Sequence, residues 1–391
     1  GTSGVQQVPV VIVDARTQQN LERYRGKLQG FGVLSTPPAT IDLTRFSRGV
    51  TRWTDEQLRE LEELAPAEAP RPSPTPRNSD VLSAVDQIAF FRSEGAVIVF
   101  ESRSGWPGAV RGFARPGTKV DNWSREGNLN SLPIVAVNPE HYNRMYRILE
   151  REIPVIIEVE IRNQIGDVVE QASNVLGEIP GSDLADEVVM LGAHFDTWHA
   201  SPNASDNTSG VAVMLEAVRI LKTVGVEPRR TIRVALWAGE EQGIFGSREY
   251  VRKHFGDPND SEIGVTPAHE NFSVYFNQDY GPGQYRGIYL QGNESARRMF
   301  TAWSEPFHDL GMTTVSPRGV GSTDHVPFDN VGLPAFQFLQ DRVGGTGGHT
   351  NLDYFDTLPL DDLRKNAVII ASFVYHAAMS NERIPRKPVA R

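Results

Sequence analysis

Short apolar runs alternate with longer amphipathic stretches along most of this chain. The runs are about four to eight residues long and rich in Val, Ile and Phe, which is typical of buried strands. The longer stretches repeat their apolar positions with helical spacing. Because strands that alternate with helices form a largely parallel sheet covered on both faces, the pattern predicts an α/β fold. In the second half of the chain we expect strands at 175–179, 188–193, 231–238, 272–278 and 335–339, and helices at 210–224, 244–254, 295–310 and 360–379.

The first half shows the same alternation, interrupted by long polar insertions. Five prolines between positions 66 and 76 exclude a helix interior there, so we predict an exposed insertion near 59–79. We expect two domains: a smaller β-rich α+β domain over 1–170, and a larger one over 171–391 in which helices flank a central mixed, mostly parallel sheet. In the smaller domain the expected strands are 8–13, 31–34, 96–101, 132–137 and 155–161, and the expected helices are 54–64, 81–93 and 141–150.

The composition excludes several classes of protein. The 391 residues carry a net charge of −10 without a basic block, which argues against nucleic acid or an anionic membrane surface as a partner. No apolar run reaches the roughly 18 residues of a membrane-spanning helix. Because the chain has no cysteine, any metal site must use His and carboxylate ligands. Arginine far outnumbers lysine, a bias typical of GC-rich bacterial genomes.

Side chains suited to metal binding follow the predicted strands of the larger domain. Ligands of such sheets bind beyond the carboxyl ends of the strands, so these positions are where function is expected. His194 and Asp196 follow the strand at 188–193, Asp206 and Asn207 come after the next loop, Glu240 and Glu241 follow 231–238, Asp279 follows 272–278, and a Gly-rich stretch after 335–339 leads to His349.

Each of these residues has an ordinary structural explanation when it is taken alone. Asp206 could cap a helix, and Glu240 with Glu241 could occupy a first helical turn. Their coincidence at one face of one sheet favours a functional site instead. Two His and three carboxylates suit one or two divalent ions such as Zn²⁺, and a pair of ions acidifies a water molecule held between them.

Adjacent glutamates can divide the work at such a site. Their side chains point in different directions, so one can bind metal while the other stays free as general base and acid. Asp196 lies two residues after His194, where its carboxylate could accept the ring N–H and fix the tautomer of the imidazole.

The motifs together resemble a known family. The stretches VVMLGAHFDTWHASPNASDNTSGVAVMLEAVRIL, ALWAGEEQGIFGS, YFNQD, STDHVPF and GGHTNLDYFDTL are similar to the co-catalytic zinc exopeptidases, with the carboxypeptidase Q-like (plasma glutamate carboxypeptidase-like) metallopeptidases as the nearest subgroup. The resemblance is close over 172–382. Residues 5–170 resemble the protease-associated domain that accompanies this catalytic domain, through the order of strands and helices and the RYRGKL stretch at 23–28.

The resemblance implies a role for each matching residue. The ligands would be His194 and Asp279 for one Zn²⁺, Glu241 and His349 for the other, and Asp206 as the bridge between them. Glu240 would be the general base that activates a metal-bridging hydroxide and then protonates the leaving amine, and Asp196 would orient His194.

Three further residues match the family with less specific roles. Asn207 follows the bridging ligand, where relatives have an unusual peptide geometry. Asp324 and His325 match a segment that lines the substrate pocket in relatives, so we assign them to substrate or transition-state contacts. The alternative, that this pair braces the turn at Pro327, stays open.

The chain departs from the family pattern at three places. Some relatives carry an oxyanion-stabilising Tyr where this chain has Gly319-Val320-Gly321, which leaves the oxyanion donor unassigned. Close relatives often have two consecutive His where this chain has Gly348 and His349. Relatives also carry an amino-terminal segment of the catalytic domain, which we expect to lie upstream of Gly1.

The leading hypothesis is a di-zinc exopeptidase, an aminopeptidase or dipeptidase acting on short peptides with a free amino terminus. One alternative is a glutaminyl cyclase-like enzyme, which uses a single zinc ion for ring closure. A second is a non-catalytic binding scaffold of the same fold. Zinc content together with a peptide activity panel discriminates among the three.

The expected partner is a short peptide, with no nucleic acid and no membrane span, and a homodimer is one option for the assembly. The family resemblance suggests a secreted or periplasmic enzyme. Side-chain specificity depends on the shape of loops around the site, which the sequence does not reveal.

Overall fold

The chain divides into two compact units. The first unit contains Gly1–Phe46, Arg71–Glu170 and His349–Leu352, and the second contains Ser47–Pro70, Gln171–Gly348 and Asp353–Arg391. The computed structural model describes residues 1–14, 16–41, 50–63, 81–102, 106–112, 124–164, 166, 171–199, 201–258, 260, 262–343 and 348–387.

The first unit is built on a five-stranded sheet with the order β5-β4-β2-β1-β6. The strands are β1 (Gln6–Ile12), β2 (Gly32–Leu34), β4 (Ile98–Glu101), β5 (Ile134–Ala136) and β6 (Ile156–Val159), and the helices are α1 (Gln18–Glu22), α3 (Ala84–Ser93), α4 (Arg125–Leu129) and α5 (Pro139–Leu149). Neighbouring strands run parallel from β1 to β5, and β6 pairs antiparallel with β1.

Successive residues of these strands face opposite sides of the sheet, and both sides are buried. Val33 packs with Phe91 of α3 on one face, whereas Leu34 packs with Tyr142 of α5 on the other. Local sequence signals start both helices, since Ser83 caps α3 through the amide of Asp86 and Asn138 caps α5 in the same way. The unit thus has helices on both faces of a mainly parallel sheet, a more regular layering than the β-rich α+β arrangement expected from the sequence.

The second unit contains a seven-stranded sheet with the order β14-β13-β15-β12-β8-β9-β7. Its strands are β7 (Val175–Ile179), β8 (Leu184–His194), β9 (Arg230–Trp237), β12 (Phe272–Asn277), β13 (Tyr285–Tyr289), β14 (Thr314–Ser316) and β15 (Ala335–Gln340). β8 pairs parallel with β9 and β12, and β12 pairs parallel with β15. The antiparallel pairs are β7 with β9 and β13 with β15. The prediction of a mixed, mostly parallel sheet is confirmed.

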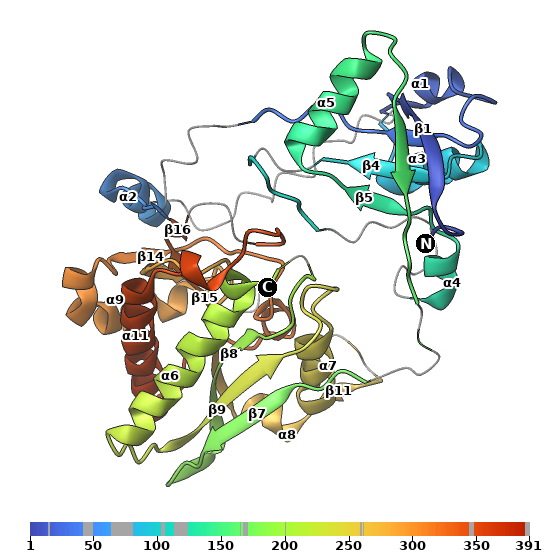
Figure 1. Cartoon of the computed structure of the whole chain (residues 1–391). Coiled ribbons are helices and arrows are strands. Elements are labelled where there is room, and N and C mark those ends of the chain that lie inside the picture. Colours follow the sequence, from blue (N-terminus) through green and yellow to red (C-terminus); the bar gives the residue numbers. More distant parts are fainter. Residues whose placement is uncertain are drawn as a thin grey trace. The chain divides into compact units, whose positions relative to one another are not determined.

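Helices flank this sheet on both faces (Figure 1). They are α2 (Asp55–Glu63), α6 (Ser209–Thr223), α7 (Phe245–His254), α8 (Pro267–Glu270), α9 (Arg297–Ser304), α10 (Val326–Asn330) and α11 (Leu360–Met379). Shorter turns of 3₁₀ or π type are η2 (Ala204–Thr208), η3 (Glu294–Ala296), η4 (Glu305–Leu310) and η5 (Phe355–Thr357), and two small ribbons pair β10 (Gly256–Asp257) with β11 (Gly264–Val265) and β3 (Val50–Thr51) with β16 (Arg342–Val343).

The central strands are apolar on both sides because each side meets a helical layer. In β8, Val189 and Leu191 belong to the cluster that includes residues of α6 and α11, which run side by side (Figure 1). Met190, between them, belongs to the opposite cluster with Tyr250 of α7 and Phe328 of α10. This alternation is the two-residue period of a strand buried on both faces.

The segment 47–70 belongs to the second unit, whereas the sequence analysis included it in the domain over 1–170. Leu58 and Leu61 of α2 pack against Leu339 of β15. The hydroxyl of Ser316 in β14 donates to the carbonyl of Leu61 at 2.7 Å. The proline-rich insertion expected near 59–79 lies outside the described residues from position 64 onward.

None of the helices in the described ranges combines the length and apolar character that a membrane crossing requires.

Candidate metal centre

Three adjacent strands deliver the candidate ligands to one edge of the sheet. β8 ends at His194, β9 is followed by Glu240 and Glu241, and β12 is followed by Asp279. The register pairs His194 with Trp237 and Asn277 with Gly192, so the three strands end at nearly the same height along the sheet. The candidate ligands that follow these strand ends therefore lie close together. Gly239, with a φ of 70°, turns the chain directly after β9 and brings the glutamates over the sheet edge.

Asp206 reaches the same edge from the turn η2 that precedes α6. Its backbone (φ −128°, ψ 87°) is not helical, and neither is that of Asn207 (φ −136°, ψ 35°). The peptide bond between the two residues is cis, at the place where the resemblance implied an unusual geometry.

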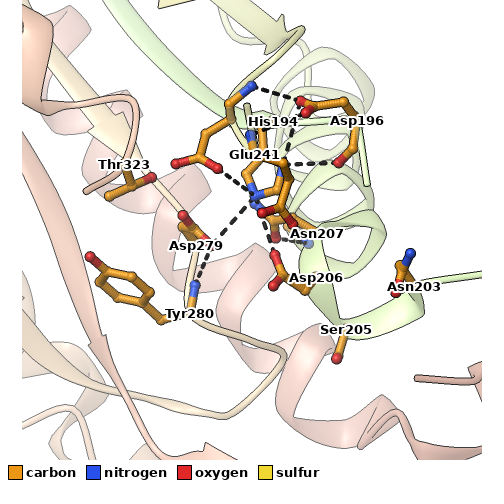
Figure 2. Close-up of polar contacts among 12 residues, drawn as sticks. His194, Asp196, Asn203, Ser205, Asp206, Asn207, Glu241, Asp279, Tyr280 and Thr323 are labelled. Atoms are coloured by element: carbon orange, nitrogen blue, oxygen red, sulfur yellow. Dashed lines mark hydrogen bonds and ion pairs between the residues drawn. The ribbon is translucent and has the colours of Figure 1, made fainter. Parts of the chain in front are cut away.

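Two groups of side chains could each hold a metal ion, and His194 belongs to both (Figure 2). One group is His194, Glu240 and Asp279, and the other is His194, Asp206 and Glu241. Within each group, the potential ligand atoms all lie within 4.8 Å of one another.

The donor set fits a divalent cation. The Nε2 atom of His194 is buried and makes no hydrogen bond of good geometry to any described residue. It lies 3.3 Å from Asp206 Oδ1 and 3.5 Å from Asp279 Oδ1. A buried imidazole nitrogen among converging carboxylates, without sulfur, is the ligand chemistry of Zn²⁺ and related ions.

Asp196 organises the site through its backbone and its side chain. Its backbone carbonyl accepts the Nδ1–H of His194 at 3.0 Å, which leaves the lone pair on Nε2, the nitrogen that faces the carboxylates. The sequence analysis gave this contact to the carboxylate, whose Oδ1 is 3.7 Å from Nδ1. The two carboxylate oxygens accept instead from the amides of Glu240 and Glu241, at 3.1 and 3.2 Å. Asp196 therefore fixes both the imidazole and the turn that carries the two glutamates.

The carboxylates repel one another at this buried site, which shifts their protonation. Burial, followed by the charge of Asp279, raises the pKa of Glu240 to about 9. Burial raises the pKa of Asp324 to about 7. Burial alone would lower the pKa of His194, but the charge of Asp279 and the contacts with other carboxylates raise it well above its usual value. Closely spaced carboxyl groups that resist ionisation would be stabilised in their charged form by a cation, so the site favours cation binding.

His349 is in neither of the two groups. The short segment His349–Leu352 belongs to the first unit, where the amide of Gly112 donates to the carbonyl of His349 at 2.7 Å. Gly348, the preceding residue, belongs to the second unit and lies near the candidate centre. A Cβ atom built on Gly348 would be 3.4 Å from Asp206 Oδ2. The ligand role of His349 stays a prediction.

Asn207, Asp324 and His325, the residues expected to contact substrate, are all buried. The side-chain amide of Asn207 donates to the carbonyl of Gln278 at 2.8 Å and accepts from the amide of Gly210 at 3.2 Å. Both ends of that amide are thus used within the protein, which favours a structural role.

The Asp324–His325 pair is also held by internal contacts. The hydroxyl of Ser247 donates to Asp324 Oδ1 at 2.6 Å. The Nε2 atom of His325 lies 3.0 Å from the carbonyl of Val320, and burial lowers the pKa of His325 to about 4. These contacts agree with the bracing alternative, although Asp324 is close enough to the centre for its charge to raise the pKa of Glu240.

Two residues at the centre were not identified from the sequence. Tyr280 follows Asp279 with a φ of 70°, its amide donates to Asp279 Oδ1 at 2.5 Å, and its hydroxyl donates to the carbonyl of Gly321. Asp353 is fully buried and accepts hydrogen bonds from the amides of Ser205 and Asp206. Asp353 stands four residues after His349 in one of the family motifs, which is the only signal that could have drawn attention to it.

Comparison with proteins of known sequence gives the same family. The model of peptidase family M28 matches residues 174–374. Carboxypeptidase Q of Homo sapiens is 26% identical over 274 residues, which cover 69% of this chain and 54% of that protein. Aminopeptidase YwaD of Bacillus subtilis is 25% identical over 265 residues, covering 66% of this chain and 54% of that protein. The chain spans about half the length of the curated relatives it matches.

Solved structures share the fold. A peptidase M28 precursor from Shewanella amazonensis superposes with a TM-score of 0.68 at 21% identity, covering 100% of this chain and 77% of that one. BSAP, a zinc aminopeptidase from Bacillus subtilis, gives a TM-score of 0.57 at 20% identity, covering 97% of this chain and 76% of that one.

The family model covers just over half of the chain and includes every candidate ligand from His194 to His349. The chain therefore belongs to peptidase family M28.

Proposed function

We propose that this chain is a zinc-dependent exopeptidase that hydrolyses a terminal peptide bond of short peptides with a free amino terminus. The observation that supports it most strongly is the convergence of Asp206, Glu241 and Asp279 on the buried Nε2 of His194. Three strand ends and one loop contribute to this convergence, which isolated helix caps or surface acids would not produce.

The residues present would suffice for two ions. His194 and Asp279 would hold one, Glu241 and His349 the other, and Asp206 would bridge them. Zinc held by these residues would polarise a substrate carbonyl and lower the pKa of a water molecule. Membership of the family, with zinc in the name of one structural neighbour, supports this choice of metal over other divalent ions.

Glu240 is the proposed general base and acid. Its Oε2 atom lies 3.9 Å from His194 Nε2, so the carboxylate faces the atoms that would hold the metal. In this role it takes a proton from the attacking water and transfers it to the leaving amine. Asp196 holds the backbone of Glu240, so the base is kept in position through its main chain rather than by its side chain.

We also propose that the first unit is a protease-associated domain and that the protein acts outside the cytoplasm. Both proposals rest on the family resemblance. The names of the relatives include a carboxypeptidase and an aminopeptidase, so the choice among aminopeptidase, dipeptidase and carboxypeptidase activity must come from experiment.

The test combines metal analysis with an activity panel. We expect about two zinc ions per chain by mass spectrometry, and hydrolysis of dipeptides or aminoacyl amides that stops on chelation and returns with zinc. One zinc ion per chain with formation of pyroglutamate would favour the glutaminyl cyclase alternative. Bound zinc without turnover of any peptide would favour a binding scaffold and contradict the proposal.

A further inference from the structure

The turn that presents Asp206 lacks a cap of its own. η2 begins after Asn203, whose side chain makes no capping hydrogen bond, so the first amides of the turn need another acceptor. Unsatisfied amides in a buried turn would be costly, and they would leave the orientation of Asp206 poorly determined.

Asp353 supplies the missing acceptors. Its Oδ1 accepts from the amide of Ser205 at 2.7 Å, and its Oδ2 accepts from the amide of Asp206 at 3.1 Å. Its backbone carbonyl accepts from the hydroxyl of Ser201 at 3.1 Å and from the amide of Ala204 at 3.4 Å. A single residue therefore accepts hydrogen bonds from Ser201, Ala204, Ser205 and Asp206, and Asp206 lies beside His194 in Figure 2.

A second carboxylate on the other side of the centre accepts from two successive backbone amides in the same way. There the carboxylate of Asp196 spans the consecutive amides of Glu240 and Glu241. In both places a buried or half-buried carboxylate accepts from two successive amides of a turn that carries candidate metal ligands. Charge-assisted bonds of this kind are stronger than neutral ones and fix a turn more firmly.

We propose that Asp353 is a positioning residue for Asp206: by holding the amides of Ser205 and Asp206, it sets the direction of the carboxylate that would serve as a metal ligand. The inference rests on the proposed function, because Asp206 needs a fixed direction only if it is a ligand. Outer partners of metal ligands generally change metal affinity about 10–100-fold when they are removed.

Three variants separate this role from simple structural support. Asp353→Ala removes both side-chain acceptors, and Asp353→Asn keeps one of them. Asp356→Ala is the matched control, because Asp356 lies three residues further along the same segment with an exposed side chain. Each protein is studied by hydrogen exchange over 201–208 without metal, and by zinc affinity in competition with a chelator.

We expect faster exchange of the Ser205 and Asp206 amides in Asp353→Ala, together with zinc binding that is about 10–100-fold weaker. Asp353→Asn should be intermediate in both measurements, and Asp356→Ala should match the wild type. Unchanged zinc affinity in a folded Asp353→Ala protein with rapidly exchanging amides would overturn the inference, since the contact would then be structural only. If Asp353→Ala does not fold, Asp353→Asn decides by the same criteria.

A failure of the proposed function would look different. In that case the wild type itself would take up no zinc, whatever happens at residue 353. Equal protection of the Ser205 and Asp206 amides in metal-free wild type and folded Asp353→Ala would overturn the inference by itself, because this carboxylate would then not hold the turn.

Discussion

At the scale of single residues, chemistry and positioning are divided between neighbours. His194 and Asp279 offer ligand atoms, whereas Asp196 and Asp353 act on the backbone of the turns that carry other ligands. The candidate ligands His194, Glu241 and Asp279 could be picked out from the sequence because each stands at or just after the end of a predicted strand. Asp353 was not, because a carboxylate that holds amides nearly 150 residues away leaves no local pattern in the sequence.

The first prediction concerns the proposed base. Glu240→Gln keeps the size of the side chain but cannot take a proton, so we expect kcat to fall about 10²–10⁴-fold. Zinc content should stay at the wild-type level, since the proposed ligands remain. Peptide hydrolysis and metal analysis on one preparation check both points. The control is Glu249→Gln, which changes an exposed glutamate on α7 and should leave the protein fully active. Near wild-type turnover in Glu240→Gln would refute the role assigned to Glu240.

The second prediction concerns Asp196. Asp196→Ala removes both acceptors for the amides of Glu240 and Glu241, so the turn loses its anchor and zinc affinity should fall about 10–100-fold. Asp196→Asn keeps one acceptor and should lose less. The backbone carbonyl that holds His194 is present in both variants, so the difference reports on the glutamate turn alone. Chelator competition gives the affinities, and equal affinities in the two variants would contradict the explanation.

At the scale of elements, the sequence predicted long regular elements well and short ones poorly. β12 and α11 match the predicted bounds to within one residue, because β12 is a largely apolar run and α11 has a clear helical period. β13 and β14 were missed: the first contains Gly287, and the second has only three residues, too few to show alternation. α10 was missed because five residues that include a proline give no helical period.

The least predictable element is the β3–α2 segment, since its partners come from the far end of the chain. The guanidinium of Arg52 donates to Asp341 at 2.7 Å and to Asp362 at 3.1 Å. The amide of Trp53 donates to Asp341 at 2.9 Å, and its indole donates to the carbonyl of Gln340 at 2.7 Å. These contacts attach the segment to the end of β15, and no periodicity in the sequence encodes them.

The third prediction tests this attachment. The side chain of Asp341 is fully buried, so Arg52→Ala leaves a buried carboxylate with one donor fewer. We expect the free energy of unfolding to fall by about 1–3 kcal/mol in urea denaturation. Arg364→Ala removes an exposed ion pair with Asp361, at 3.6 Å, and should cost less than about 1 kcal/mol. Equal losses in the two variants would mean that the Arg52 contacts are ordinary surface pairs.

At the scale of the whole molecule, the second unit concentrates negative charge around the buried His194 at one sheet edge, and a bound cation would offset that charge. The chain carries a net charge of −10, and four candidate carboxylates lie in the two groups around His194. The sequence predicted this concentration because parallel strands end at the same edge. It could not predict how strongly burial would oppose ionisation there, which depends on the packing of the folded chain.

The fourth prediction follows from that opposition. In the metal-free protein the pKa of Glu240 rises from 4.5 to about 9 and that of Asp324 from 3.8 to about 7, mainly through burial. Both groups therefore bind a proton more tightly when folded. Their contribution to stability is complete below about pH 4 and is lost as the pH rises through 7 and then 9. We expect the chelated protein to melt at a lower temperature at pH 8.5 than at pH 5.5.

Zinc at a thousandfold excess over its Kd should add about 4 kcal/mol to the free energy of unfolding, a rise in Tm on the order of 10 °C. Because zinc needs deprotonated ligands, this gain should be larger at pH 8.5. Thermal melts with chelator and with zinc at both pH values check each step, and Glu240→Gln should show a weaker pH dependence without metal. A chelated protein that becomes more stable between pH 5.5 and 8.5 would show that the carboxylates are not opposed by burial as the structure indicates.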